Sequence, residues 1–383
     1  MKVILTDGNF RHTLAAVRSL GKGGNDVTAL SHIPGSISFH SRFCSHHVIA
    51  PDPEKDPRFA EFLLAYVRNN AYDVLLPVSF AAVMQVSGIR QELERYTRIS
   101  LASAPALAVA GNKDRTFRYA EEIGVRIPKT WYPRTDEDAE EIARRVTYPV
   151  VIKGSEESGF VRYANTPGDL MDNYRAVAQY SPVIQEYVAG KGYGFFALYN
   201  HGEARAIFMH RRIREYPVTG GPSAVAESVY DPELRDAGLR ILDGLAWHGV
   251  AMVEFKKDER TGEFVLMEIN PKFWGSLGLA IASGVDFPRL ACRLAIDGDI
   301  GPVLSYKTGI RYRWLLPSDL FHVITNPRAL PQFIRDFGDR TMESDIDLRD
   351  PAPAFLQAGM TAAEFVIRVS QHRFWRPHGR PDF

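Results

Sequence analysis

The sequence predicts a protein of mixed α/β and α+β class with two or three domains, and three observations carry this prediction. In the first hundred residues, short apolar runs alternate with amphipathic stretches, which is typical of a parallel sheet with crossover helices. From Thr130 onward strand-like segments dominate and meet at hairpin turns, which indicates antiparallel sheets. After about residue 305 the chain is richer in Pro, Arg and aromatic residues, so we expect a C-terminal extension.

The first domain is expected over residues 1–105. The turn Thr6-Asp7-Gly8-Asn9 follows the first predicted strand, at a position where open α/β sheets bind ligands. Ala104-Pro105 breaks the pattern and marks the boundary. The predicted strands are Val3–Leu5, Val27–Leu30, Val74–Pro77 and Thr97–Leu101, and the predicted helices are 12–20 and 58–68.

The second domain is expected over residues 106–305, and the extension over 306–383. Hairpin turns are expected at Asn200-His201-Gly202 and Arg260-Thr261-Gly262. The extension has amphipathic segments at 327–337 and 361–371 and a tail from His372. In the second domain, the predicted strands are 149–153, 183–186, 195–199, 204–209, 251–255 and 264–269, and the predicted helices are 106–122, 136–145, 167–178 and 231–247.

Composition and charge exclude several classes of partner. The chain has 46 basic and 46 acidic residues, so no net field attracts nucleic acid or an anionic membrane. No apolar stretch is long enough to span a membrane, and the first residues lack the apolar core of a signal peptide. The only cysteines, Cys44 and Cys292, form no disulfide framework, which fits a cytoplasmic protein. We interpret Cys44, His46 and His47 as a surface turn rather than a zinc site, because their spacing matches no common zinc pattern.

Two apolar strands near residue 260 carry a candidate metal site of Glu254, Glu268 and Asn270. Glu268 and Asn270 are two residues apart, so on a strand they share a face, while Met267 and Ile269 are expected on the other face. Oxygen ligands without His or Cys suit Mg²⁺. The alternative is a solvated antiparallel hairpin. The turn from Lys272 to Ser276 favours the metal site, because it places a cation, a hydroxyl and a glycine beside it.

The segment EINPKFWGS resembles the metal-binding signature of the ATP-grasp superfamily, in particular its carbamoyl-phosphate-synthetase-like carboxylate–amine ligases. Upstream segments are similar to that family in the same order. Lys113 stands in an expected helix, Lys153 ends an expected strand, and Gln185-Glu186-Tyr187-Val188 is similar to the strand that binds adenine. The resemblance implies a pre-ATP-grasp domain followed by a two-lobed ATP-grasp fold that holds ATP and Mg²⁺.

Roles for individual residues follow from the resemblance. The lysines would neutralise the triphosphate, the loop from Gly154 to Gly159 would close over it, and the Gln185 side-chain carbonyl would accept the adenine amino group. The implied ATP-binding residues are Lys113, Lys153, Ser158, Gly159, Gln185, Glu186, Val188 and Arg211, the metal ligands are Glu254, Glu268 and Asn270, and the catalytic residues are Arg212 and Lys272.

Three positions depart from the family pattern. Gly192 stands where a glutamate usually binds the ribose, Gly154 follows Lys153 where proline is common, and Lys272 replaces a frequent arginine. Lysine lacks the planar fork of arginine, so its contact with an anion is less directional.

The segment from His210 to Pro217 contains Arg211, Arg212 and Arg214 and is expected to end a strand before a flexible loop. These arginines are candidates for binding the γ-phosphate and a substrate carboxylate. A solvated basic turn is the alternative.

The predicted function is an ATP-dependent ligase that activates a small-molecule carboxylate as an acylphosphate and joins it to an amine. No nucleic-acid or membrane partner is expected, and a homodimer is kept as one option for the assembly. One alternative is an ATP-binding regulatory or scaffold protein with a catalytically weak site. Another is an enzyme that releases a phosphorylated product without amination.

Overall fold

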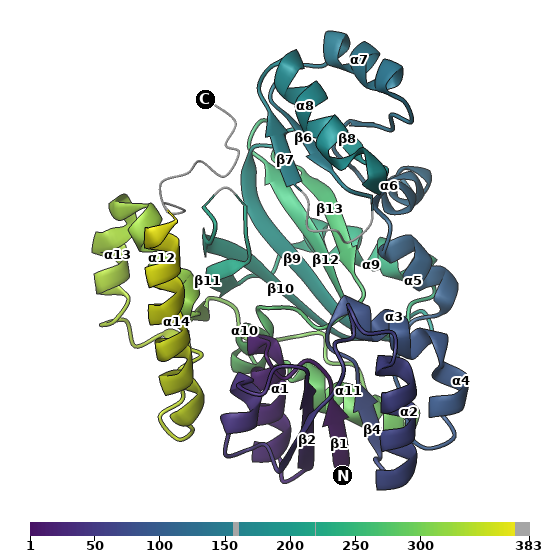
Figure 1. The fold of residues 1–383 in the computed structure, drawn as a ribbon, viewed down its shortest axis with the longest axis vertical. Coiled ribbons are helices and arrows are strands. Elements are labelled where there is room, and N and C mark those ends of the chain that lie inside the picture. Colours follow the sequence, from purple (N-terminus) through teal and green to yellow (C-terminus); the bar gives the residue numbers. More distant parts are fainter. Residues whose placement is uncertain (156–160, 219, 372–383) are drawn as a thin grey trace.

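A computed structural model describes residues 1–155, 161–218 and 220–371. Figure 1 shows an N-terminal α/β unit, a small lobe at the opposite end, a large sheet between them, and C-terminal helices along one side. This arrangement confirms the predicted fold class of a parallel α/β unit followed by antiparallel sheets. No helix among the described residues is long and apolar enough to cross a membrane.

The N-terminal unit is a four-stranded parallel sheet in the order β3-β2-β1-β4. Because the strand order reverses at β1, the carboxyl ends of β1 and β4 form the crevice where such sheets bind ligands. The strands are β1 (Lys2–Leu5), β2 (Asp26–Ser31), β3 (His46–Ile49) and β4 (Val74–Leu76), and the helices are α1 (Arg11–Lys22), α2 (Phe59–Asn70), α3 (Phe80–Gly88) and α4 (Arg90–Leu93), with a 3₁₀ turn at Ile37–His40.

Two predictions for this unit are wrong. The strand expected at Thr97–Leu101 is a single bridge between Arg98 and Val74, because the chain turns away toward a helix capped by Ser103. The surface turn expected around His46 is instead the exposed edge strand β3. Among the described residues no three His, Cys, Asp or Glu side chains form a metal site.

The helix expected over 106–122 is interrupted and forms two helices. The first, α5 (Ala104–Ala110), ends before Gly111, and the second, α6 (Lys113–Glu122), begins after Asn112. The Asn112 side chain accepts a hydrogen bond from the Arg115 backbone N–H, so it caps α6 and places Lys113 at its first position.

The small lobe is a four-stranded antiparallel sheet in the order β5-β8-β6-β7. Its two helices both begin with a capping box, formed by Thr135 with Asp138 and by Thr166 with Asp169. The elements are β5 (Thr130–Trp131), α7 (Asp136–Arg145), β6 (Val150–Lys153), β7 (Val161–Ala164), α8 (Pro167–Val177), a 3₁₀ turn (Ala178–Tyr180) and β8 (Val183–Glu186).

The large sheet has seven strands in the order β13-β12-β9-β10-β11-β14-β15, antiparallel except for its last pair. Both predicted hairpin turns are present, between β9 and β10 and between β12 and β13. The strands are β9 (Gly190–Asn200), β10 (Glu203–Glu215), β11 (Ser223–Ser228), β12 (Gly249–Asp258), β13 (Phe264–Asn270), β14 (Arg311–Arg313) and β15 (Met342–Ser344), and the helices are α9 (Pro232–Gly244), α10 (Leu277–Ala282) and α11 (Phe287–Asp297).

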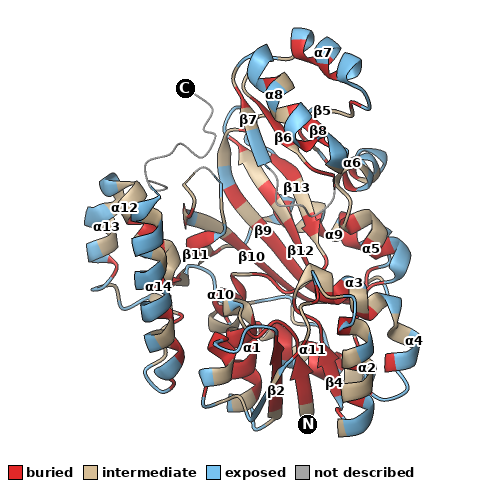
Figure 2. Ribbon diagram, in the orientation of Figure 1, coloured by how far each residue is buried: buried red, intermediate tan, exposed pale blue. Residues whose placement is uncertain are grey.

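Both faces of the large sheet are buried, as Figure 2 shows by the red strands at its centre. Phe195 and Tyr199 of β9 pack with α9 on one face, while Phe196 and Leu198 pack on the other with α10, α11 and the N-terminal unit. Cys292 of α11 belongs to this second core. The N-terminal unit is therefore fixed against the large sheet by apolar packing.

The chain after residue 305 is tied into the same sheet through β14 and β15. Arg214 of β10 is buried and pairs with Asp319 and Asp336, and Arg313 also pairs with Asp319. These ion pairs hold the C-terminal elements against β10. The elements are a π-type turn (Leu315–Asp319), α12 (Leu320–Thr325), a 3₁₀ turn (Pro327–Ala329), α13 (Leu330–Arg335) and α14 (Ala352–Ser370), and the tail from His372 lies outside the described residues.

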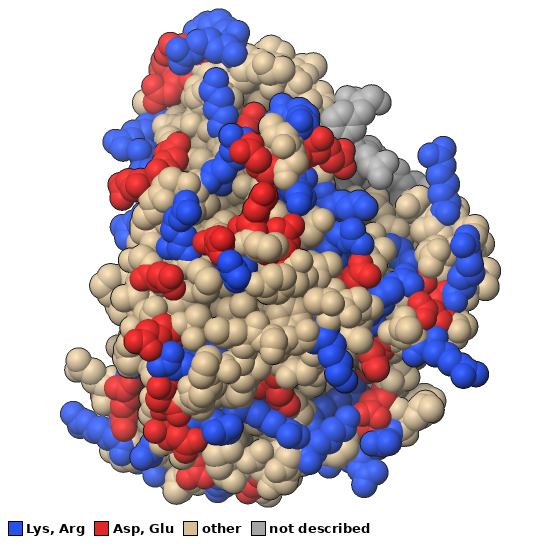
Figure 3. Space-filling model, turned by 180° about the vertical axis from the view of Figure 1, so that it is seen from behind, with Lys and Arg blue, Asp and Glu red and all other residues tan. Residues whose placement is uncertain are grey.

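Basic and acidic side chains are interspersed on the face opposite to that of Figure 1, as Figure 3 shows. This distribution agrees with the formal net charge of zero.

Candidate active site

A cavity of about 540 Å³ lies between the small lobe and the large sheet. Residues from both lobes, from α6 and from the start of α1 line it. Ten of the predicted site residues are among them: Lys113, Lys153, Gln185, Glu186, Val188, Arg212, Glu254, Glu268, Asn270 and Lys272.

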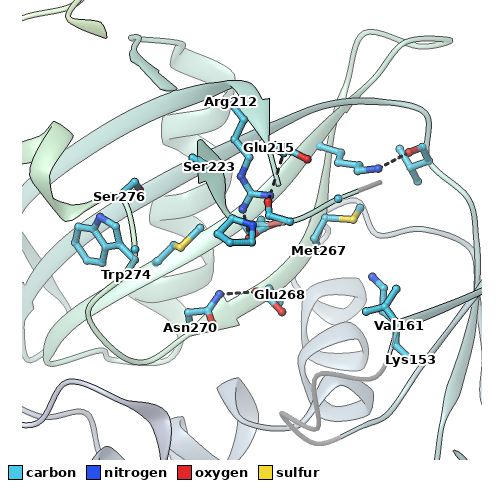
Figure 4. A pocket seen from close by; sticks show the side chains of 18 of the residues that line it. Lys153, Val161, Arg212, Glu215, Ser223, Met267, Glu268, Asn270, Trp274 and Ser276 are labelled. Atoms are coloured by element: carbon cyan, nitrogen blue, oxygen red, sulfur yellow. Dashed lines mark hydrogen bonds and ion pairs between the residues drawn. The ribbon is translucent and has the colours of Figure 1, made fainter. Parts of the chain in front are cut away.

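Glu254 and Glu268 stand opposite each other on β12 and β13. The Asn270 amide donates a hydrogen bond of 2.7 Å to Oε1 of Glu268, and Figure 4 shows these two side chains next to each other. Burial raises the pKa of Glu254, and the neighbouring Glu268 raises it further against the opposing effect of Arg212. Two buried carboxylates that repel each other, with an amide oxygen beside them, form a donor set suited to Mg²⁺.

Met267 does not point away from the site as predicted. Glu254 pairs with Glu268 and Phe255 pairs with Leu266, so Met267 is the extra residue of a β-bulge. The bulge interrupts the alternation of side chains, and Met267 lines the cavity beside Glu268. The site therefore has an apolar wall that simple strand alternation did not predict.

Lysines surround the carboxylate pair. Burial, with a smaller effect of the nearby Lys113, lowers the pKa of Lys153 to about 8. Burial alone would raise the pKa of Glu268, but Lys113, the Asn270 amide and Lys272 outweigh it, and this pKa is lowered. Cations gathered so closely disfavour one another's charge, and a polyanion between them would relieve this cost.

The predicted adenine strand has an unsatisfied acceptor. Gln185 is 1% exposed, and its Nε2 donates to Thr130 Oγ1 at 2.8 Å. Its Oε1 is buried and has no hydrogen-bond partner among the described residues. An orphaned buried carbonyl in the cavity wall fits the amino group of an adenine.

The arginines after His210 separate into three environments. Arg212 points into the cavity, as Figure 4 shows, and it pairs with Glu254 at 2.5 Å. Arg211 lies on the other face of β10, pairs with Glu227 and does not line the cavity, because neighbouring side chains on a strand alternate. The predicted placement of Arg211 at the phosphates is therefore wrong, and Arg214 serves the buried network described above.

Part of the predicted phosphate loop cannot be placed. Ser158 and Gly159 lie outside the described residues. Ser155, which precedes them, accepts a hydrogen bond of 2.7 Å from the Lys113 backbone at its carbonyl.

Several cavity residues were missed by the sequence prediction. Arg11 and His12 come from the start of α1, just after the turn at residues 6–9. Open α/β sheets bind ligands at such a turn, so its position in the sequence was the signal that could have found these two residues. His210 Nε2 is 2.8 Å from Ser276 Oγ, and burial and Arg212 hold the pKa of His210 well below its ordinary value. The imidazole of His210 is therefore neutral.

Gly192 leaves room for the side chains of Arg212 and Glu215. A Cβ at this position would lie 2.8 Å from Cδ of Arg212 and 3.0 Å from Oε1 of Glu215. Glu215, from the end of β10, also lines the cavity. A carboxylate thus lies beside the position where this chain lacks the glutamate of the family pattern.

Comparisons with known proteins point to one fold. The family described as "ATP-grasp in the biosynthetic pathway with Ter operon" matches residues 181–316. The large chain of carbamoyl phosphate synthase from Thermotoga neapolitana is 25% identical over 82% of this chain and 30% of its own length, and the N-terminal section of that large chain from Methanopyrus kandleri is 23% identical over 82% of this chain and 58% of its own length. The chain thus spans 58% of the length of the second of these relatives and 30% of the length of the first.

Solved structures share the fold at low sequence identity. Biotin carboxylase from Campylobacter jejuni has a TM-score of 0.66 and 14% identity, covering 81% of this chain and 74% of its own. The biotin carboxylase domain of 2-oxoglutarate carboxylase from Hydrogenobacter thermophilus, in complex with MgADP, ADP and bicarbonate, has a TM-score of 0.65 and 16% identity, with 81% and 73% covered. An L-amino acid ligase from Bacillus licheniformis has a TM-score of 0.61 and 16% identity, with 79% and 77% covered.

The predicted recognition is confirmed by the matching family, the relatives and the shared fold. The two-lobed architecture, with paired carboxylates and lysines at the cavity between the lobes, agrees with them. The chain is therefore similar to ATP-grasp proteins over residues 181–316 and shares the fold of these solved structures.

Proposed function

We propose that this protein uses ATP to activate a small-molecule carboxylate and then joins it to an amine. The observation that carries the proposal is the facing pair Glu254 and Glu268, which lines the cavity between the lobes together with Lys113 and Lys153. Acceptor carboxylates and donor cations in one partly enclosed site suit a metal-bound triphosphate.

Each part of the cavity has a role in this proposal. Glu254, Glu268 and Asn270 hold Mg²⁺, which supplies charge neutralisation at the phosphates. Lys113 and Lys153 bind phosphate oxygens. The adenine amino group donates to Gln185 Oε1, with the Glu186 and Val188 backbone at its edge and Met267 against its face.

The chemistry balances without a protein nucleophile. A carboxylate oxygen of the substrate attacks the γ-phosphorus of ATP, the bond to ADP breaks, and an acylphosphate forms. The amine nitrogen then attacks the acyl carbon, phosphate leaves, and the amine loses a proton as the amide forms. Arg212 and Lys272, which line the cavity, stabilise the negative charge on the transferred group.

Glu215 is our candidate for the ribose partner. It lies at the space left by Gly192 and lines the same cavity. If Glu215 accepts from the ribose hydroxyls, Glu215→Ala should reduce the preference for ATP over 2′-deoxy-ATP, whereas the Glu227→Ala control should keep it. If Glu215→Ala keeps the wild-type preference for ATP over 2′-deoxy-ATP, Glu215 does not bind the ribose.

The proposed function is tested by ADP release from ATP and Mg²⁺ with pools of small carboxylates and amines. We expect ADP only when a carboxylate is present, and an amide when an amine is added. Full turnover in Glu268→Gln would show that the metal assignment is wrong.

One observation favours the regulatory alternative. Arg212 pairs with Glu254, and this ion pair competes with a metal for the same carboxylate. Tight ATP binding without ADP release in any substrate pool would support a regulatory protein, and a stable phosphorylated product would support an enzyme without amination. The homodimer and the cytoplasmic location stay predictions, the first tested by the mass in solution.

A further inference from the structure

A second cavity, of about 350 Å³, lies between α1, α10, the β14–β15 edge and α14. Its volume falls in the range of small-molecule sites, roughly 300–1,000 Å³. Tyr312 and Trp314 contribute aromatic surface to its wall. A Cβ on Gly278 would lie 2.7 Å from the Tyr312 hydroxyl, so this glycine leaves the space that the tyrosine occupies.

Most charged side chains around this cavity already have partners. Arg18 pairs with Asp350 at 2.8 Å, and Lys22 pairs with Asp347 at 2.6 Å. Glu343 is exposed at the rim, where water solvates it. Two further charged side chains line the cavity, the buried carboxylate of Asp345 and the guanidinium of Arg11.

Asp345 is 8% exposed, and only one of its oxygens is satisfied. Its Oδ1 accepts from the Leu315 backbone N–H at 3.2 Å, whereas its Oδ2 is buried and has no hydrogen-bond partner among the described residues. A buried carboxylate oxygen without a partner is costly, and a cationic group would offset that cost.

Arg11 lies at the boundary between the two cavities and lines both. Its guanidinium stacks on Trp314 at 4.7 Å and donates to the Ser223 carbonyl and the Ser318 hydroxyl, which are both neutral. No carboxylate of the described residues lies within ion-pair distance of Arg11. A Cβ on Gly275 would lie 3.0 Å from Nη2 of Arg11, which places the guanidinium against the turn that follows the metal ligands.

Arg11 and Asp345 are therefore close without touching. Arg11 stacks on Trp314, Asp345 accepts from the next residue, Leu315, and the Asp345 charge opposes the lowering of the Arg11 pKa by burial. A ligand that carries an anion and a cation a few bonds apart would satisfy both side chains at once.

We propose that the carboxylate substrate is an amino acid, with its carboxylate on Arg11 facing the ATP cavity and its ammonium group on Asp345 in the second cavity. This inference rests on the proposed function and names the substrate class. It also gives the orientation of the amino acid, because the carboxylate bound to Arg11 faces the proposed phosphate site. The paired ions Arg18–Asp350 and Lys22–Asp347 hold the walls of the cavity in place.

The test compares the common L-amino acids, one by one, with carboxylates of the same chain length that lack the amine. ADP release is measured with ATP, Mg²⁺ and hydroxylamine as a small acceptor amine, and the thermal stabilisation by each compound is measured separately. We expect one or a few amino acids to support turnover and to raise the melting temperature, and the amine-free carboxylates to do neither. Asp345→Asn keeps the acceptor for Leu315 and should raise the KM for the amino acid at least about tenfold with little change in the KM for ATP.

Asp297→Asn is the control, because it removes an exposed carboxylate that pairs with Arg293 and lines neither cavity. It should leave both KM values within about twofold. Equal use of amine-free carboxylates by the wild type and Asp345→Asn would overturn the inference and leave the proposed function intact. Stabilisation by amino acids that Asp345→Asn abolishes, without ADP release, would support the binding site while the proposed function fails. Neither stabilisation nor turnover with any amino acid would overturn the inference, and no ADP release with any carboxylate would overturn the proposed function as well.

Discussion

The two cavities that meet at Arg11 differ in how their charges are arranged. The first cavity gathers cations around facing carboxylates, and burial shifts the pKa of Lys153 and Glu254 toward their neutral forms. In the second, ion pairs neutralise most charges and leave Arg11 and Asp345. The comparison teaches that the proposed triphosphate site is marked by several cations gathered around facing carboxylates, whereas the proposed amino-acid site is marked by the two charges that remain after ion pairing.

The largest effect is expected at the metal end of the first cavity. Glu268→Gln removes one of two facing carboxylates, and we expect kcat to fall about 100-fold or more, because the metal neutralises charge throughout phosphoryl transfer. Steady-state ADP release checks this. Glu263→Gln, an exposed residue at the start of the same hairpin, is the control and should keep wild-type turnover.

The buried carboxylate of the second cavity should make the free energy of unfolding depend on pH. Burial raises the pKa of Asp345 from 3.8 to about 6, against the opposing effects of Arg11 and Arg18. The folded state therefore holds a proton that the unfolded state releases, so this residue destabilises the fold increasingly as the pH rises from about 4 to 6, and fully above that.

Asp345→Asn removes this penalty. We expect the ligand-free variant to be more stable than the wild type by about 1–2 kcal/mol at pH 8 and nearly equal at pH 4.5. Urea unfolding at both pH values measures it. If the stability of the variant relative to the wild type is lower at pH 8 than at pH 4.5, the carboxylate of Asp345 is satisfied within the fold.

The adenine end of the first cavity should give a smaller effect on binding. Gln185→Met removes the orphaned Oε1, and we expect the KM for ATP to rise about fivefold to tenfold with kcat less affected. Thr130→Val keeps Gln185 Oε1 but removes the partner of Gln185 Nε2, together with the hydrogen bond from Thr130 to the Pro128 carbonyl, and serves as the control. Equal KM increases in both variants would mean that Gln185 acts by supporting the strand.

The smallest effect is expected outside the cavity. Arg211→Ala breaks a partly exposed ion pair with Glu227, so we expect kcat and KM for ATP within about twofold of the wild type. Arg212→Ala should reduce turnover strongly, because Arg212 faces the carboxylates. Equal losses in the two variants would contradict the separation of these neighbours across β10.

The first cavity could largely be predicted from sequence because its residues follow apolar strands in recognisable order. Lys153 ends a strand, and Glu268 and Asn270 share one. The bulge at Met267 could not be predicted, since it depends on the register between β12 and β13. Arg211 was misplaced because three arginines in one short segment do not show which of them faces inward.

The second cavity could not be predicted, because residues more than three hundred positions apart form it. Arg11 follows β1, whereas Asp345 follows β15 at the far edge of the large sheet. Asp345 has no local pattern that indicates a ligand, and Arg11 has only its place just after the first turn of the parallel sheet. Only the packing of α1 against the C-terminal elements brings the two charges to one aromatic wall.

The most direct test of the account follows oxygen from the substrate carboxylate. With an ¹⁸O-labelled carboxylate that supports ADP release, activation through an acylphosphate predicts that one labelled oxygen appears in the released phosphate for each amide formed. Mass spectrometry of the phosphate measures this transfer. Unlabelled phosphate accompanying amide formation would contradict the account.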